Sequence, residues 1–469
     1  MSAPTLTEAA LDELVTLAGL PRPAGGQVRI AGGDPVLPTR YRIGTAGAAS
    51  LAATGHAGGH LWTLRGGQPQ QIAVDTRAAA ASLRSARYLQ VDGKPLPAMW
   101  DPFSGMYAVK DGRWVSIHCN FSNHREAALK VLGGAADRAA AAKAALGWDG
   151  LALEDAIHAA GGCAGLVRTA GDWALHPQSV AVAAQSLLEI VRIGDAPPEP
   201  LPAAARPLSG VRVLDLTRVL AGPTCARTLA EHGADVLKVT AVHLPDSGLV
   251  DLDTGLGKLS ARIDLRSKEG LEALRALVRE ADVFSQSYRP GALASRGFSP
   301  PALADLRPGI VCVTLSAWGT SGPWKERRGF DSIVQCVSGI AHASGTAAQP
   351  KLLPVSAIDY VAGHLMALGA MAALARRARE GGSWLVRVSL ARTGQWIVDR
   401  GLVPQAALEG VADELPQDEI ARLCTETDAP EGKIRHLKPV VAMSETPPHW
   451  VRPPVPLGYH APVWPPRGG

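Results

Sequence analysis

An aspartate at the start of a long apolar stretch is the residue of this chain best suited to chemistry. Asp359 lies in the segment AIDYVAGHLMALGAM, whose small and apolar residues predict a buried helix. The first turn of a helix carries the positive end of its dipole, so we expect Asp359 to be ionised and close to backbone N–H groups. A carboxylate in that setting could act as a nucleophile. Position alone fits an ordinary N-cap aspartate equally well.

A run of basic residues, KERRGF at 325–330, offers a second chemical group. Arg328 within it could hold phosphates, because a guanidinium binds them through paired hydrogen bonds. The alternative is a solvated surface charge run. His118, Cys119 and His124 also lie close in sequence. Alternation along the predicted strand separates them and no carboxylate joins them, so the pattern does not predict a metal site.

The elements that would position such groups are clearest in residues 210–239. Val211–Leu216 is an apolar run typical of a parallel strand buried on both faces. Ala221 and Gly222 interrupt the run, and Pro223 is suited to the first turn of a helix. A second strand completes a βαβ unit. Its first turn places backbone N–H groups where an anionic ligand could bind.

Strands and helices alternate from residue 210 to residue 400. We expect strands at Val211–Leu216, Val236–Val239, Asp282–Ser285, Ile310–Leu315 and Leu385–Leu390, and helices at 224–232, 267–280, 330–341 and 358–379. This order predicts an α/β fold with a doubly wound, Rossmann-like parallel sheet. A smaller α+β domain is expected before it, because Met106–Val109 and Trp114–Ile117 flank an Asp-Gly turn typical of a hairpin.

Composition divides the chain further. A Pro- and Ala-rich stretch before residue 210 has the character of a linker. Residues 37–83 and 353–397 share the order Leu-Pro, small-residue helix, arginine, Gly-Gly and strand, which indicates a partial internal copy. The expected units are a partial copy of the main half at 1–87, a small α+β domain at 88–194, a linker at 195–209, the main domain at 210–400, and a proline-rich tail at 401–469 that packs back on the domains.

Bulk composition excludes several classes of protein. A hydrophobic content of 46% with 19% charged residues is typical of a globular protein. The net charge of +4 is small for 469 residues, which argues against a nucleic-acid partner. Six cysteines without a CxxC pair favour a reduced, cytoplasmic protein without disulfides or bound metal. The first residues lack the pattern of a signal peptide, and no apolar run reaches about 18 residues, so no membrane span is expected.

Residues 210–400 resemble the family III CoA-transferases in several segments that follow the family's order. The segments are GVRVLDLTRVLAGP (210–223), HGADVLKV (232–239), DTGLGKLSARIDLRSKEG (253–270), ADVFSQSYRPG (281–291), LRPGIVCVTLSAWGTSGPW (306–324), RRGFDSIVQCVSG (327–339) and IDYVAGHLMALGAMAALARR (358–377). Residues 100–190 resemble the family's small domain, which here comes first in the chain.

The resemblance implies a CoA-transferase that moves CoA from an acyl-CoA thioester to a carboxylic acid. The reaction would pass through a mixed anhydride and a thioester on Asp359. Coenzyme A or acyl-CoA is then a substrate, and no cofactor is bound permanently. The partners implied are these small molecules and a second copy of the chain in a homodimer, or a monomer in which the two internal copies pair.

The resemblance also implies a set of CoA-binding residues. These are Val219, Ala221, Gly222, Pro223, Lys258, Tyr288, Arg289, Arg296 and Arg328. Thr240, Ala241 and Ser287 depart from the family, which usually has an acidic residue, a basic residue and an asparagine there. In the N-terminal copy the place of Asp359 falls at Ile43–Thr45, which has no carboxylate, so that copy is expected to be catalytically silent.

Two alternatives to CoA transfer remain at this point. The first is a non-catalytic acyl-CoA-binding homologue, which the three divergent positions suggest. The second is a 2-methylacyl-CoA racemase or epimerase. Phe330 argues against it, because the racemases of the family have a histidine there and a phenyl ring cannot carry a proton.

Overall fold

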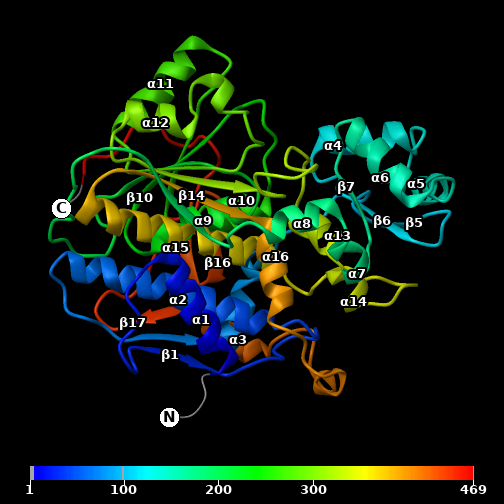
Figure 1. Ribbon diagram of the computed structural model, residues 1–469, viewed down its shortest axis with the longest axis horizontal. Coiled ribbons are helices and arrows are strands. Elements are labelled where there is room, and N and C mark those ends of the chain that lie inside the picture. Colours follow the sequence, from blue (N-terminus) through cyan, green and yellow to red (C-terminus); the bar gives the residue numbers. More distant parts are fainter. Residues whose placement is uncertain (1–4, 98–99, 468–469) are drawn as a thin grey trace.

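A seven-stranded sheet organises the computed structural model, which describes residues 5–97 and 100–467 (Figure 1). The strand order is β11-β10-β9-β12-β13-β14-β8. The strands are β8 (Glu189–Gly194), β9 (Arg212–Leu216), β10 (Asp235–Thr240), β11 (Lys258–Arg262), β12 (Val283–Gln286), β13 (Val311–Ser316) and β14 (Ser383–Ser389). Neighbours in this sheet pair in parallel, except that β8 runs antiparallel to β14 at the edge. The fold is therefore mixed α/β.

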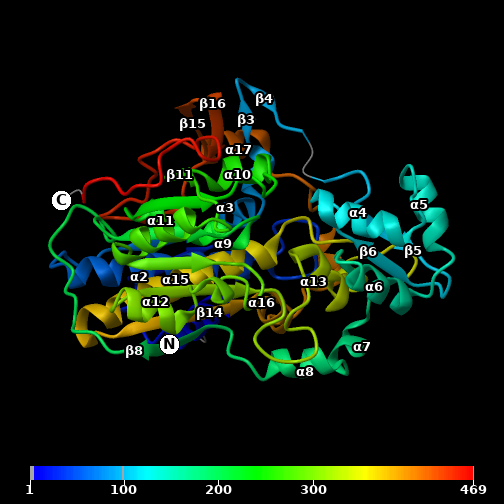
Figure 2. The ribbon, with the colours of Figure 1, turned by 90° about the horizontal axis from the view of Figure 1, so that it is seen from above.

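Helices cover both faces of this sheet, because successive side chains of each strand point to opposite sides. Val213 belongs to the core beneath α9 (Ala221–Glu231) and α15 (Ala357–Glu380). Leu214, the next residue, belongs to a separate core beneath α11 (Lys268–Arg279) and α12 (Pro300–Leu306) (Figure 2). The remaining helices of this half are α10 (Leu249–Thr254), α13 (Asp331–Val337), α14 (Ile340–Ser344) and α16 (Leu390–Asp399).

The five strands expected in residues 210–400 are all present as β9, β10, β12, β13 and β14. The expected helix at 330–341 is instead two helices, α13 and α14. Gly339 separates them with a φ of 88°, and a Cβ there would lie 2.5 Å from the backbone nitrogen of Ala170. Strands β8 and β11 were not predicted, because neither segment stands out from its polar neighbours as an apolar run.

The first residues build a second, smaller sheet. Its order is β1-β2-β17, with β1 parallel and β17 antiparallel to β2. The elements are α1 (Leu6–Ala18), β1 (Val28–Ala31), α2 (Ile43–Leu64), β2 (Ile72–Asp75), α3 (Thr76–Ser82) and β17 (Val441–Met443). Helix α2 lies along α15 between the two sheets (Figure 1). By length and composition alone α15 could cross a membrane, but its most apolar stretch is wholly buried in the protein.

The predicted hairpin is confirmed as β5 (Gly105–Ala108) and β6 (Trp114–Ile117), which pair antiparallel. With β7 (Ala164–Leu166) they form a three-stranded sheet. The helices that follow the hairpin are α4 (Ser122–Val131), α5 (Arg138–Ala145), α6 (Gly150–Ala159), α7 (Ala170–Ala174) and α8 (Pro177–Ala183). Strand β8, which falls inside the range expected for the small domain, completes the main sheet instead.

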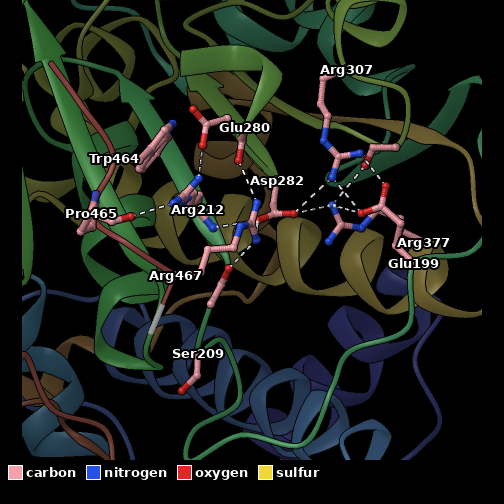
Figure 3. Close-up of polar contacts among 12 residues, drawn as sticks. Glu199, Ser209, Arg212, Glu280, Asp282, Arg307, Arg377, Trp464, Pro465 and Arg467 are labelled. Carbon is pink, nitrogen blue, oxygen red and sulfur yellow. Dashed lines mark hydrogen bonds and ion pairs between the residues drawn. The ribbon is translucent and has the colours of Figure 1, made fainter. Parts of the chain in front are cut away.

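Residues 401–469 contain more regular structure than the expected proline-rich tail. They hold α17 (Gln417–Leu423) and a hairpin of β15 (Cys424–Ala429) and β16 (Gly432–Leu437). The hairpin joins β3 (Gln90–Val91) and β4 (Lys94–Pro95) in a four-stranded sheet. The final stretch is extended, and Trp464 packs against the main half, donating its indole N–H to the carbonyl of Leu277 at 3.0 Å. Its ring lies beside Arg212 (Figure 3).

Candidate functional site

Two buried carboxyl groups meet at the start of α15. An Oδ atom of Asp331, the first residue of α13, accepts the backbone N–H of Asp359 at 3.0 Å. Gln335, one turn along α13, donates its side-chain amide to the same carboxylate. The carboxylate of Asp359 itself accepts no hydrogen bond from the residues that the structure describes. Neither of its oxygen atoms is among the fully buried polar atoms that lack a partner in the described residues, so the carboxylate keeps some access to solvent and to a reactant.

The surroundings of Asp359 oppose the ionisation that its place at the start of a helix favours. Burial raises the pKa of Asp359 well above its ordinary range, and the negative charge of Asp331 raises it further. Burial also raises the pKa of Asp331, although the backbone N–H of Asp359 opposes the shift. The dipole of α15 favours the anion by a smaller amount than burial and a neighbouring carboxylate disfavour it. Two acids this close lose their protons as a coupled pair.

The beginning of α9 lies beside Asp359. Gly363 lies one turn further along α15, on the same face as Asp359. It touches the first turn of α9, since a Cβ at Gly363 would lie 2.5 Å from the carbonyl oxygen of Ala221. The chain enters α9 through Val219, whose φ of 68° is strained for a β-branched residue. The first N–H groups of α9 have no partner within the helix. They can therefore stabilise negative charge that develops at Asp359.

Three arginines converge near this point from separate segments. His124 lies near Arg218, Arg289 and Arg328, and burial followed by these three positive charges lowers the pKa of His124 to about 4. None of the three arginines forms an ion pair with a carboxylate of the described chain. Guanidinium groups that lack a carboxylate partner can bind phosphate or other anions, although that of Arg218 also donates to the carbonyl of Pro245 at 2.6 Å.

Aromatic rings connect the arginines to the carboxyl pair. Phe330 immediately precedes Asp331, and its ring stacks on His118 with centroids 3.8 Å apart. The guanidinium of Arg218 lies 5.1 Å from the ring centroid of Phe121. Burial lowers the pKa of His118 to about 3, so its imidazole is neutral at neutral pH. His118 and Phe121 of the small α+β domain thus lie on one side of the site. Helix α13 and the β9–α9 turn lie on the other side.

The other predicted residues of the β9–α9 turn are buried. Ala221, Gly222 and Pro223 form the first turn of α9, which begins two residues earlier than Pro223. A Cβ at Gly222 would lie 2.3 Å from the Cβ of Thr217, so the turn requires glycine there. Ala221 and Gly222 can offer backbone N–H groups to a ligand, whereas Pro223 has none, and no side chain of the three is reactive.

Lys258 is not available to a ligand, contrary to the expectation from the resemblance. Its ammonium is buried and donates to Asp215 at 2.8 Å and to the carbonyl of Pro223 at 2.8 Å. Burial lowers the pKa of Lys258 to about 8. This lysine fixes the first turn of α9 to β9 from inside the protein.

Two further predicted residues lie at the carboxyl ends of the strands. Tyr288 and Arg289 line a cavity of about 420 Å³ over β12, β13 and β14. Arg296 lies on an exposed turn and donates to the carbonyl of Ala292, with no contact to the three arginines in the part of the chain that the structure covers. Ser287, one of the divergent positions, accepts the backbone N–H of Arg218 at 3.3 Å.

Sequence reasoning missed Arg218 and the role of the histidines. Arg218 is adjacent to Val219, so its place in a ligand-binding turn was the available signal. The sequence does not show that His118 stacks on Phe330 or that His124 meets the same ring edge-on, because both contacts join distant segments. Thr240 and Ala241 are buried at the end of β10, where they add no charge to the site.

Comparison with known proteins finds a protein family that part of this chain resembles. Residues 208–420 match the family described as CoA-transferase family III. The "Succinyl-CoA--L-malate CoA-transferase alpha subunit" of Chloroflexus aurantiacus is 34% identical over 199 residues, or 39% of this chain and 46% of the relative. The "Probable fatty acyl-CoA transferase Rv3272" of Mycobacterium tuberculosis is 31% identical over 200 residues, or 40% of this chain and 51% of the relative. The chain thus spans about half the length of these curated relatives.

Two solved structures are each similar to part of the chain. The crystal structure of Rv3272 from M. tuberculosis is 30% identical, with a TM-score of 0.39, and covers 42% of this chain and 59% of its own. The crystal structure of a CAIB/BAIF family protein from Brucella suis is 26% identical, also with a TM-score of 0.39. The match covers 49% of this chain and 65% of that protein's chain.

Proposed function

Because residues 208–420 match the family described as CoA-transferase family III, we propose that this protein transfers CoA from an acyl-CoA thioester to a carboxylic acid with Asp359 as the nucleophile. The observation that carries the proposal is the unpartnered, buried carboxylate of Asp359 beside the first turn of α9. In an N-cap aspartate the side chain accepts backbone N–H groups of its own helix. Here Asp331 has that role, which leaves Asp359 free to react.

The reaction follows from the chemistry of a thioester and a carboxylate. The ionised carboxylate of Asp359 attacks the acyl carbonyl, the C–S bond breaks, and a mixed anhydride and CoA thiolate form. The thiolate then attacks the aspartyl carbonyl, which releases the donor acid and leaves an aspartyl-CoA thioester. The acceptor carboxylate attacks that thioester and again displaces the thiolate. Finally the thiolate attacks the acceptor's acyl carbon, which yields the new acyl-CoA and restores the carboxylate.

The environment of Asp359 suits each of these steps. A raised pKa makes its carboxylate more basic and so a better nucleophile once ionised. Burial limits water, which would hydrolyse the anhydride. The N–H groups at the start of α9 can stabilise the tetrahedral oxyanion.

The arrangement also supports binding of CoA. Arg218, Arg289 and Arg328 are unpaired cations that can bind CoA phosphates, and they replace the charge that Lys258 cannot supply. We infer that the main half is a doubly wound, Rossmann-like domain. The strand order and the helices on both faces support this, because ligands of such sheets bind at the carboxyl ends of the strands.

A trapping experiment tests the reaction. The protein is incubated with acyl-CoA and then treated with hydroxylamine or borohydride, and the modified peptide is identified by mass spectrometry. We expect modification at Asp359, and we expect Asp359→Asn to lose exchange of label between acyl-CoA and free acids. Asp264→Asn, at an exposed aspartate, is the control. Full exchange by the Asp359→Asn protein would contradict the proposal, and CoA binding without any exchange in the unmodified protein would favour the non-catalytic alternative.

A further inference from the structure

A constant shift in residue number relates two parts of the chain. Helix α2, strand β2 and helix α3 occur in the same order as α15, β14 and α16. Helix α2 begins at Ile43 and α15 at Ala357, a shift of 314 positions. The same shift relates β2 to the carboxyl end of β14. It also relates Asp75 to Ser389, which are the N-cap residues of α3 and α16.

The two strands occupy the same place in their sheets. β2 lies between a parallel strand, β1, and an antiparallel strand, β17. β14 lies between the parallel β13 and the antiparallel β8. The smaller sheet thus repeats the β13-β14-β8 edge of the larger one.

Packing between helix and sheet is also repeated. A Cβ at Gly55 of α2 would lie 3.0 Å from the side chain of Ile72 in β2. At the shifted position in α15, a Cβ at Gly369 would lie 2.5 Å from the side chain of Val386 in β14. Both glycines allow a small-residue helix to approach its strand closely, and Ile72 and Val386 are themselves related by the shift.

The start of each long helix has the same carboxylate cap. Asp34 accepts the backbone N–H groups of Gly44 and Thr45, each at 2.8 Å. Asp331 accepts the backbone N–H of Asp359 in the same way at 3.0 Å. The shift relates Thr45 to Asp359. The N-terminal copy therefore has a capping carboxylate of its own, Asp34, which the shift does not relate to Asp331, and it has a threonine in place of the nucleophile.

The two copies contact each other through equivalent residues. Ser50 of α2 and His364 of α15 are related by the shift, and their side chains hydrogen-bond at 2.9 Å. Contact between equivalent positions is the mark of a two-fold interface. The short hairpins β3–β4 and β15–β16 also pair with each other, with Val91 of β3 opposite Ile434 of β16. Figure 1 shows α2 and α15 side by side between the two sheets.

Each half also completes the sheet of the other. β8 precedes the linker but pairs with β14, which follows it. β17 follows the linker but pairs with β2, which precedes it. This exchange ties the two halves together within one chain.

We infer that this chain is an internal two-fold pair, in which α2 and α15 form the interface, and that one chain with one reactive site is the functional unit. The partner that covers the apolar face of α15 is the chain's own α2, not a second copy of the protein. The number of reactive sites rests on the proposed function, whereas the internal pairing does not.

Light scattering and cleavage of the linker test the pairing. Multi-angle light scattering of the intact protein should give the mass of one chain, 48.9 kDa. A protease site inserted after the exposed Ala203 allows the peptide chain to be cut between residues 1–203 and 204–469. We expect the two fragments to elute together from a sizing column without denaturant, because β8 and β17 cross between the halves. The unmodified protein treated with the protease is the control.

Each outcome decides the inference. A mass of two chains, or fragments that separate after cleavage, would overturn the internal pairing. One trapped covalent modification per chain, absent in Asp359→Asn, would support a single site. Two modifications per chain would overturn the single site. If no group is trapped on any residue, the proposed transfer fails, while mass and co-elution still judge the pairing.

Discussion

At the scale of single residues, the reactivity of this site depends on the neighbour of Asp359. Asp331 caps the start of α15 and adds a negative charge that holds the pKa of Asp359 high. The carboxyl group of Asp359 therefore ionises at a higher pH than that of an ordinary aspartate. Activity that needs the carboxylate should rise with pH through that range.

Replacing Asp331 with asparagine tests this coupling. Asp331→Asn keeps an oxygen that can accept the N–H of Asp359 but removes the charge. We expect the pKa of Asp359 to fall, so the acid limb of the kcat/KM profile should move to lower pH by about one unit or more. The measurement is the pH dependence of CoA transfer. An unchanged limb, or one that moves to higher pH, would show that Asp331 does not control Asp359.

The charge of Arg328 should affect binding more than chemistry. It is one of three unpaired arginines near His124. A hydrogen bond to a charged group contributes about 1.5–3 kcal/mol, so Arg328→Gln should raise KM for acyl-CoA about tenfold or more with little change in kcat. The control is Arg266→Gln, because Arg266 is exposed and already paired with Asp264. Equal kinetic effects of the two substitutions would argue against a CoA site at Arg328.

At the scale of elements, the close approach of α9 and α15 brings the oxyanion donors to the nucleophile. Gly363 permits this approach because it has no side chain between the helices. The strained Val219 turns the chain sharply into α9. Together they set the distance between the first turn of α9 and Asp359, on which electrostatic stabilisation of the transition state depends.

Adding one methyl group at Gly363 should disturb this geometry. In Gly363→Ala the new Cβ would lie 2.5 Å from the carbonyl oxygen of Ala221, so α15 must move away. We expect a cost of about 1–3 kcal/mol and a loss of kcat. The matched control is Gly59→Ala in α2, where the nearest atom lies at 3.5 Å and helix propensity favours alanine by about 1 kcal/mol. Thermal unfolding and initial rates measure both variants, and equal stability of the two would contradict the close packing.

At the scale of the whole molecule, a buried aspartate joins the linker, the main sheet and the final residues (Figure 3). Asp282 contacts Arg377 at 3.0 Å, Arg467 at 3.1 Å and Arg307 at 3.4 Å. Arg307 also pairs with Glu199 of the linker. Burial alone would raise the pKa of Asp282, but the arginines and a backbone N–H lower it.

Removing the charge of Asp282 should weaken these connections. Asp282→Asn removes the anion nearest to the buried Arg377 and leaves it only Glu199 at 3.6 Å, and we expect a loss of about 3 kcal/mol at pH 7. A lowered pKa means that the stabilisation is present above the ordinary aspartate range and is lost as pH falls through the folded value. The difference in thermal midpoint between the two proteins should therefore shrink in acid. The control is Asp418→Asn, at an exposed pair worth less than about 1 kcal/mol. Equal midpoints for the Asp282 variant and the unmodified protein at pH 7 would contradict this role.

The sequence by itself determined five strands of residues 210–400, the helices α9, α11 and α15, the β5–β6 hairpin and the position of Asp359 at the start of a long helix. These features depend on local patterns, such as apolar runs, turn residues and small-residue helices, which act over a few neighbouring positions. The internal copy was also visible, because its order of elements is repeated along the chain.

Only the tertiary structure decided the burial of Asp359 beside Asp331, which raises its pKa, the burial of Lys258 and the grouping of Arg218 with Arg289 and Arg328. It also decided that α2 packs on α15 and that β8 and β17 exchange between the halves. The physical reason is that pKa values and charge clusters depend on burial and on distances of a few ångströms between segments far apart in the chain. Local patterns do not encode those distances.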